Sequence, residues 1–151
     1  IFSFFNRETG THNFQSDKAI ESITSGGFFG KGIGEGVLKN RVPEAHTDYI
    51  ISVISEEFGV VAIMLILLLF LILIYMVFKK ISFETNDKVK LILIGSISLI
   101  LMQATIHIGV NIRLFPTTGM TLPFLSYGGS SIISTSILGG IILNLTKRKI
   151  T

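Results

Sequence analysis

Three long apolar stretches, separated by polar segments, organise the chain after its first 49 residues. The clearest stretch covers 60–78, where every residue is apolar or tyrosine and no charge, amide, glycine or proline occurs. Crossing the hydrocarbon core of a bilayer takes roughly 20 residues of helix, and a helix buried in a soluble protein rarely needs apolar residues on every face. The pattern therefore predicts a membrane-spanning helix over 50–79.

Two later stretches predict further spans, over 91–110 and 128–146. The first of these contains Gln103 and His107, whose polar groups need protein neighbours inside a membrane. The second is rich in glycine and serine, and small residues let helix backbones approach closely in lipid, so we expect it to pack inside a bundle. The predicted fold class is all-α, a polytopic transmembrane helix bundle.

The placement of basic residues predicts the orientation of these spans. Lysines gather around the 80–90 loop, and lysine and arginine occur in the tail at 147–151, so both segments are expected in the cytoplasm. Residues 1–49, with a short helix predicted over 16–24, then form a large extracytoplasmic loop, and 111–127 forms a second one. The chain is thus expected to be a multi-pass membrane protein with a cytoplasmic C-terminus.

Composition supports a membrane protein and excludes several kinds of site. Only 15% of the residues are charged, against about a quarter in soluble domains. The absence of cysteine excludes disulfides and thiolate metal sites, and the modest net charge of +3 gives no reason to expect a nucleic-acid partner. The chain begins with Ile1 and shows no signal peptide, so we expect it to start within a larger protein.

A glycine-rich segment, GGFFGKGIGEG at 26–36, raises the question of phosphate binding. A P-loop is excluded because Ser25 stands where the motif needs glycine and Gly32 where it needs a hydroxyl residue. A dinucleotide site is excluded because no strand is predicted before the glycines. From the glycines alone, a flexible loop is favoured over a backbone that bends closely around another group, with Lys31 as a point charge for an anion.

Ionisable residues alternate just before the first predicted span, in PEAHTD at 43–48. In an extended segment Glu44, His46 and Asp48 would point to one side. If the helix begins near Tyr49, Asp48 lies roughly 18 Å before the uninterrupted apolar run, at the outer surface or a cavity opening onto it. A carboxylate there is either a functional group or a helix N-cap, and the residues alone leave both readings open. A single nearby histidine argues against zinc, whereas Mg²⁺ or Mn²⁺ fits carboxylate oxygens.

Two adjacent carboxylates, Glu56 and Glu57, occupy the opening half of the first span. Because neighbouring helix positions lie about 100° apart, we expect that they cannot both face the same partner. One would face a cavity while the other reaches the interface or pairs with a base; alternatively, both acids simply favour the helix N-terminus.

The loop at 111–127 has an unusual composition for a surface connection. Prolines and glycines prevent a regular helix, yet four large apolar residues occur among them: Phe115, Leu122, Phe124 and Leu125. Non-helical backbone at membrane depth must be buried in protein or line a cavity. We therefore expect a re-entrant loop that dips into the membrane.

Four motifs, in order and with apolar spans between them, resemble a known family: GKGIGEG, PEAHTDYI, EEFG and FPTTGMTLPFLSYGGSS. From about residue 15 to residue 146 the chain is similar to the C-terminal part of the SEDS (shape, elongation, division, sporulation) proteins, and more to the division members than to the elongation members. The resemblance implies a bundle of about ten transmembrane helices in the bacterial inner membrane, of which this chain would supply the last three.

The resemblance also implies an activity, the polymerisation of lipid II into glycan strands at the division septum, with release of undecaprenyl diphosphate. Asp48 matches the loop aspartate of the family's HTD motif and is implied to be the catalytic residue, as general base or essential polar group for the attacking hydroxyl. The expected partners are the lipid II-linked glycan, membrane lipids, a class B penicillin-binding protein transpeptidase and other division proteins. The candidate substrate-binding residues are Lys31, Arg41, Glu44, His46, Glu56, Glu57, Arg113, Ser126 and Ser130.

Two other functions remain open at this point. Gln103 and His107 would suit the headgroup path of a lipid II flippase, although ionisable groups concentrated at one face favour surface chemistry. A non-catalytic division scaffold, or a fragment of a split gene, is the third reading. For the chain alone we predict no activity, because three helices cannot enclose a lipid substrate.

Overall fold

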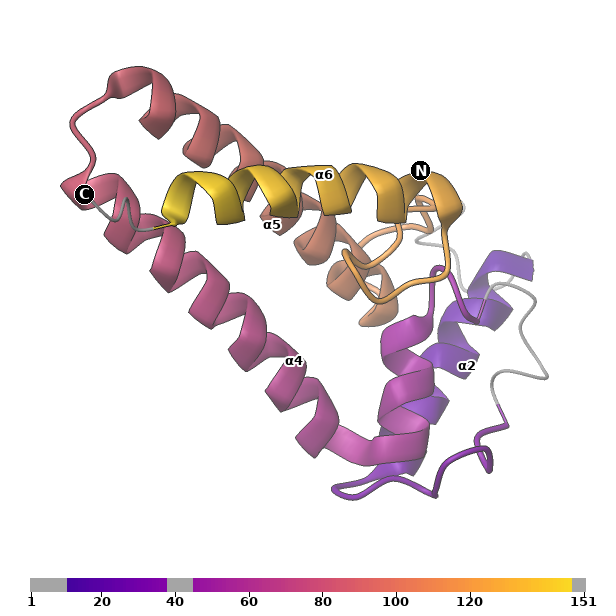
Figure 1. Cartoon of the computed structure of the whole chain (residues 1–151). Coiled ribbons are helices and arrows are strands. Elements are labelled where there is room, and N and C mark those ends of the chain that lie inside the picture. Colours follow the sequence, from indigo (N-terminus) through magenta and orange to yellow (C-terminus); the bar gives the residue numbers. More distant parts are fainter. Residues whose placement is uncertain (1–10, 38–44, 148–151) are drawn as a thin grey trace.

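The computed structural model describes residues 11–37 and 45–147 (Figure 1). Every regular element in these two ranges is a helix, and three of the helices are long and apolar enough to cross a membrane, by length and composition. The helices are α2 (Thr11–Gly26), α4 (Ile50–Phe83), α5 (Asp87–Asn111) and α6 (Gly129–Thr146). The predicted fold class, an all-α protein with three potential spans, is confirmed.

Helix α2 extends beyond the predicted 16–24 helix and packs against the start of α4. Ala19 is fully buried in a cluster with Tyr49, Val53 and Val110, which joins α2 to both α4 and α5. Gly27, with φ of 58°, supplies the left-handed residue that commonly ends a helix.

Helix α4 is broken at Gly59, which has φ of 79° and ψ of −176°. This backbone conformation is essentially restricted to glycine. The helix therefore consists of a short segment over 50–58 and a long limb over 60–83, and the short segment turns sharply away from the axis of the limb (Figure 1). The predicted helix over 50–79 did not include this break, and Asp48 does not lie on a straight extension of the apolar run.

The glycine-rich segment 26–36 fills this break. The backbone groups that lose their helical partners at the break bond instead to the backbone of this segment. Four hydrogen bonds make the connection: Lys31 N to Glu56 O at 2.8 Å, Gly32 N to Glu57 O at 3.1 Å, Val60 N to Gly27 O at 3.0 Å and Val61 N to Phe28 O at 3.4 Å.

Glycine is required on both sides of this contact. A Cβ on Gly59 would lie 2.2 Å from the carbonyl oxygen of Phe28, and a Cβ on Gly30 would lie 2.2 Å from that of Glu57. No side chain fits at such distances. The prediction of a flexible loop is therefore wrong, because the glycines let this backbone bend closely around the broken helix.

The long limb of α4 packs with α5 and α6 around an apolar cluster. Its buried members are Val77, Leu93, Ile97, Ile100 and Ile142. Within the described chain Thr135 and Ile142 are the buried residues of α6. The expectation that α6 packs on several sides inside a larger bundle stays a prediction.

The polar connections separate to opposite ends of the molecule. Figure 1 places the α4–α5 connection and the C-terminal end of α6 together, and α2, the 45–49 turn and the 112–128 loop at the other end. In the α4–α5 connection, the hydrogen bond from Lys80, at 2.9 Å, holds the pKa of Glu84 below its usual range. The segments predicted to share a side of the membrane therefore lie together.

Candidate functional site

Residues 45–49, which carry the HTD motif, form consecutive turns that lead into α4. The His46 side chain is exposed, whereas Asp48 is only 5% exposed. The expectation that these two side chains point to one side is therefore wrong, because it assumed an extended backbone. Tyr49 occupies the N-cap position of α4, so Asp48 is not the N-cap residue of this helix.

Three successive carbonyl oxygens of this turn each accept a hydrogen bond from the region that links α5 to α6. The three bonds run from Tyr127 N to His46 O at 3.1 Å, from Ser126 Oγ to Thr47 O at 2.9 Å and from Asn111 Nδ2 to Asp48 O at 2.9 Å. We call these three bonds the carbonyl clamp. Because two of its donors belong to SYGGSS, the clamp joins the HTD and SYGGSS motifs into one site.

Ser126 is 1% exposed and its hydroxyl is engaged on two sides. It donates to the Thr47 carbonyl and accepts a hydrogen bond from the backbone N–H of Leu122 at 2.8 Å. The prediction that Ser126 binds substrate is therefore not supported, because its hydroxyl faces the protein interior. It fixes the loop against the HTD turn instead.

Asn111, at the last position of α5, is fully buried and makes four hydrogen bonds through its side-chain amide. Nδ2 donates to the carbonyls of Asp48 and His107, both at 2.9 Å. Oδ1 accepts from Ser52, from Oγ at 2.7 Å and from the backbone N–H at 3.2 Å. Sequence reasoning missed Asn111 and Ser52. The spacing of four residues between His107 and Asn111, which puts both on one helix face, was the available signal.

The 112–128 loop is anchored on α5 by two further side chains. Gln103 Nε2 donates to the carbonyl of Thr121 at 2.8 Å, and His107, fully buried, has Nδ1 3.1 Å from the carbonyl oxygen of Met120. Both side chains therefore bind the loop. This removes the observation that had suggested a polar path for a lipid headgroup through the membrane.

Lys31 and Glu56 form an ion pair at the same end of the molecule. Lys31 Nζ lies 3.0 Å from Oε1 of Glu56, which is 2% exposed. The pair borders a polar cavity of about 160 Å³, lined by Lys18, Glu21, Ser22, Ser25, Lys31, Val37 and Glu56. The charge of Lys31, predicted to meet an anionic ligand, is thus balanced by a carboxylate of the protein.

Glu57 lies beside this pair. A Cβ on Gly36 would lie 3.2 Å from Oε2 of Glu56 and 3.3 Å from Oε1 of Glu57, so both carboxylates approach the same glycine. The expectation that adjacent positions keep the two groups from a common partner is wrong, because they stand at the end of the short segment, where the chain leaves the helix.

The other candidate residues have different surroundings. Arg113 bonds to Asp17 of α2 through its guanidinium, so it ties the 112–128 loop to α2. Ser130 is exposed in the first turn of α6. Arg41 and Glu44 lie outside the described residues.

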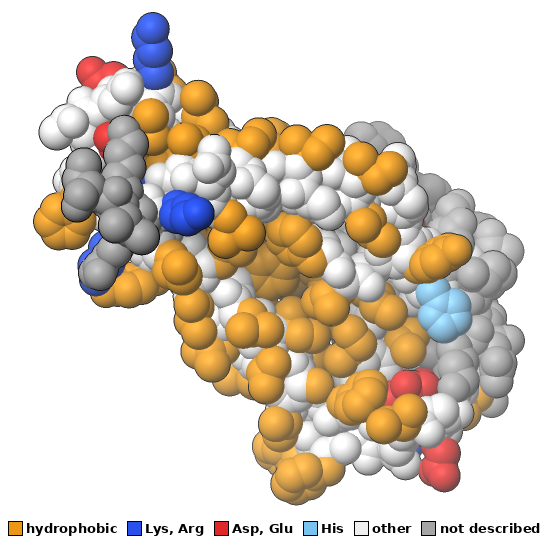
Figure 2. Space-filling model, viewed as in Figure 1, with side chains coloured by type: hydrophobic (Ala, Val, Ile, Leu, Met, Phe, Trp, Pro, Cys, Tyr) orange, Lys and Arg blue, Asp and Glu red, His pale blue; other side chains and the backbone are white. Residues whose placement is uncertain are grey.

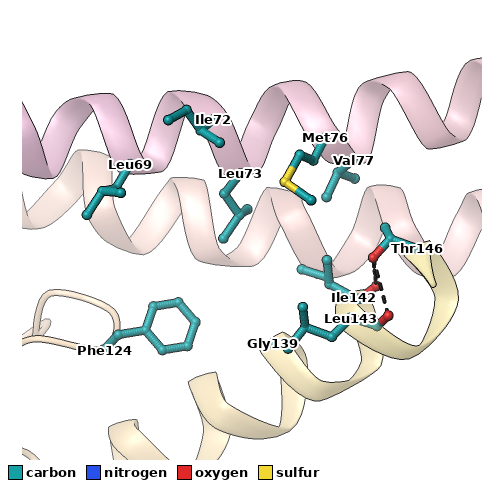
Figure 3. Close-up of a pocket in the computed structure, with 10 residues that line it drawn as sticks. All are labelled: Leu69, Ile72, Leu73, Met76, Val77, Phe124, Gly139, Ile142, Leu143 and Thr146. Atoms are coloured by element: carbon teal, nitrogen blue, oxygen red, sulfur yellow. Dashed lines mark hydrogen bonds between the residues drawn. The ribbon is translucent and has the colours of Figure 1, made fainter. Parts of the chain in front are cut away.

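An apolar groove runs between the long limb of α4 and α6, with the loop residue Phe124 projecting into it (Figure 3). Two hollows of about 320 and 360 Å³ share Leu69, Leu73 and Phe124. A Cβ on Gly139 would lie 3.3 Å from the Phe124 ring, so this glycine gives the ring room to approach α6. Figure 2 shows apolar side chains over the middle of this face and charged ones toward its ends.

A metal site was expected to involve the carboxylates near the HTD motif. In the two described ranges no group of three or more histidine, aspartate or glutamate side chains is arranged to hold a metal ion. Because Glu44 lies outside these ranges, the possible Mg²⁺ or Mn²⁺ ion stays a prediction.

Three helices able to cross a membrane, with a polar site at one end, define a multi-pass membrane protein. A sequence profile of the FtsW/RodA/SpoVE family, described as cell cycle proteins, matches residues 1–150, and the chain belongs to this family. The family predicted from the motifs is confirmed.

Curated relatives carry a more specific name, probable peptidoglycan glycosyltransferase FtsW. The protein of Enterococcus hirae is 40% identical over 138 residues, or 91% of this chain and 35% of the relative. That of Caulobacter vibrioides is 40% identical over 94% of this chain and 36% of the relative. That of Trichlorobacter lovleyi is 41% identical over 97% of this chain and 39% of the relative. The chain thus spans little more than a third of the length of these relatives.

Proposed function

We propose that this chain is part of a peptidoglycan glycosyltransferase that polymerises lipid II into glycan strands at the division septum. The observation that carries the proposal is the carbonyl clamp, which holds the turn of the buried Asp48 at one end of the three potential spans. A buried carboxylate at the end of a membrane bundle is typical of a functional site. The name that relatives about 40% identical carry supports the reaction class.

In the proposed reaction, the 4-hydroxyl of one lipid II attacks the anomeric carbon of the lipid-linked strand. The bond from that carbon to the diphosphate breaks, and undecaprenyl diphosphate leaves. Asp48 acts as general base and takes the proton of the attacking hydroxyl, which requires an approach to about 3 Å. Burial of this carboxylate and the clamp on its backbone favour a fixed orientation, which lowers the cost of reaching the reactive geometry.

The surroundings of the candidate substrate contacts divide them into two groups. Lys31 and Arg113 each form an ion pair with a carboxylate of the protein. We therefore assign them a structural role at the end of the molecule that carries the HTD turn. His46, exposed and two residues from Asp48, is the described candidate best placed to meet a sugar or diphosphate. Arg41 and Glu44 stay candidates through the resemblance alone.

The remaining parts of the proposal concern orientation and partners. The end with α2 and the HTD turn faces the extracytoplasmic side, and the C-terminus lies in the cytoplasm, in keeping with the lysines of the α4–α5 connection. A class B penicillin-binding protein is the proposed transpeptidase partner. No step of the proposed reaction is assigned to a metal ion.

Polymerisation by the full-length protein tests the proposal. The protein is reconstituted in vesicles with lipid II, alone and with its class B penicillin-binding protein, and the products are separated. We expect glycan strands and released undecaprenyl diphosphate. Lipid II that crosses the bilayer without polymer would instead indicate a flippase, and neither product would indicate a scaffold. The 151-residue chain alone should make no polymer, because three helices do not enclose a lipid substrate.

A further inference from the structure

Asn111 reaches from the end of α5 to the backbone of the residue proposed to carry the chemistry. We propose that Asn111 is a positioning residue for Asp48, whose side-chain amide fixes the Asp48 carbonyl and the start of α4 in the geometry that catalysis needs. The inference rests on the proposed function, since it takes Asp48 as the general base. Asn111 itself is not proposed to contact substrate.

The hydrogen-bonding capacity of this amide is matched to its surroundings. A side-chain amide offers two hydrogens and two lone pairs. In Asn111 the hydrogens go to the carbonyls of Asp48 and His107, and the lone pairs accept from the backbone N–H and hydroxyl of Ser52. With the side chain fully buried, these four bonds define a single orientation of the amide.

The direction of each bond explains why an amide is needed. Nδ2 faces two carbonyl oxygens, so the isosteric carboxylate of Asn111→Asp would place an acceptor against two acceptors. Oδ1 faces two donors, so a leucine would leave both groups of Ser52 without this partner. Either change releases the Asp48 carbonyl while keeping the number and branching of the side-chain heavy atoms.

The contact also connects the site to the second loop. The His107 ring, one turn before Asn111, has Nε2 3.4 Å from Asn111 Nδ2 and Nδ1 3.1 Å from the Met120 carbonyl oxygen. A single buried chain of polar contacts therefore runs from the 112–128 loop through α5 to the turn of Asp48. A movement of the loop would therefore shift the Asp48 backbone through this series of polar contacts.

Turnover at saturating lipid II and KM are measured for full-length protein carrying Asn111→Leu or Asn111→Asp. We expect turnover to fall about 10- to 100-fold, with KM within about threefold of the parent, because a misplaced catalytic group slows the reaction more than it weakens binding. The matched control is Leu93→Ala, at the other end of α5, which opens a cavity in the apolar core without touching the HTD turn. Its turnover per folded protein should stay near the parent value.

A labelling experiment reports on position without using activity. The chain contains no cysteine, so in a full-length protein made cysteine-free elsewhere Asp48→Cys gives a single thiol. Its reaction with a water-soluble maleimide should be slow, and should become severalfold faster when Asn111→Leu is added but not when Leu93→Ala is added. Parent-like turnover in the Asn111 variants, or an unchanged labelling rate, would overturn the inference. If Asp48→Asn itself polymerises normally, the proposed catalytic role fails separately, and the labelling rate alone then decides whether Asn111 fixes the turn.

Discussion

The hydroxyl of Ser126 donates a hydrogen bond to the backbone carbonyl of Thr47, 79 residues earlier in the chain, at 2.9 Å. The same hydroxyl accepts the backbone N–H of Leu122. One small buried side chain thus connects the loop after α5 to the residue next to Asp48. This contact gives the SYGGSS motif a physical role beyond close helix packing.

Ser126→Ala removes both hydrogen bonds, including the one that the backbone N–H of the buried Leu122 donates. We expect the protein to lose about 1–3 kcal/mol of stability, and polymerisation to fall roughly tenfold as the HTD turn loosens. Thermal unfolding in detergent and a polymerisation assay measure the two effects. Ser134→Ala is the control, because that hydroxyl is exposed on α6 and bonds to the carbonyl of Ser130 one turn earlier. Equal activity in the two variants would show that the Ser126 contact is dispensable.

Gly59→Ala should be strongly destabilising. The added Cβ would lie 2.2 Å from the Phe28 carbonyl oxygen, in a backbone conformation that alanine rarely adopts. We expect a loss of about 3 kcal/mol or more, visible as a lower unfolding temperature and poor membrane yield. Gly95→Ala, at a position on α5 where an added Cβ meets nothing within 4 Å, should be neutral or slightly stabilising. Similar behaviour of the two variants would contradict the close contact at the helix break.

The Lys31–Glu56 pair is tested by a double-mutant cycle. Lys31→Met leaves the carboxylate of Glu56 buried without this cation, and should cost about 1–3 kcal/mol. This range is below that of a fully buried pair, because the Lys31 side chain is 38% exposed and partly screened by solvent. Adding Glu56→Gln should recover much of the loss. If the double variant is as unstable as the sum of the single ones, the two side chains do not interact.

The proposed orientation predicts which ends are accessible from which side. Single cysteines at Ile33, in the glycine-rich segment, and at Thr85, between α4 and α5, are labelled in intact cells with a membrane-impermeant maleimide. Ile33→Cys, at an 81% exposed position, should react from outside, and Thr85→Cys only after the cells are opened. The reverse pattern would invert the topology and move the HTD turn to the cytoplasm.

Much of this architecture could be predicted from local composition. The uninterrupted apolar run over 60–78 marks a membrane span by itself, because no soluble environment requires it. The lysines of the α4–α5 connection and the motif order then indicated the orientation and the family. These signals depend on single segments, so they do not require knowledge of tertiary contacts.

Most of the errors and omissions concern contacts between distant segments. The sequence EEFG predicts a regular helix by itself. The break at Gly59 depends on hydrogen bonds to the glycine-rich segment, which lies elsewhere in the sequence. Ser126 was expected to bind substrate, and its hydrogen bonds to backbone groups 79 and 4 residues away could not be inferred from the motif. Asn111 was overlooked because one polar residue at the end of a span has many explanations, and the carbonyl it binds lies 63 residues earlier.

The central claim, that Asp48 is the general base of a lipid II polymerase, is tested most directly by Asp48→Asn in the reconstituted full-length protein. The change keeps the size of the side chain and removes its ability to accept a proton. Asp87→Asn is the matched control, an 89% exposed aspartate at the opposite end of the molecule. We predict that Asp48→Asn lowers the polymerisation rate by at least about 100-fold while Asp87→Asn stays within about twofold of the parent. A parent-like rate for Asp48→Asn would contradict the account.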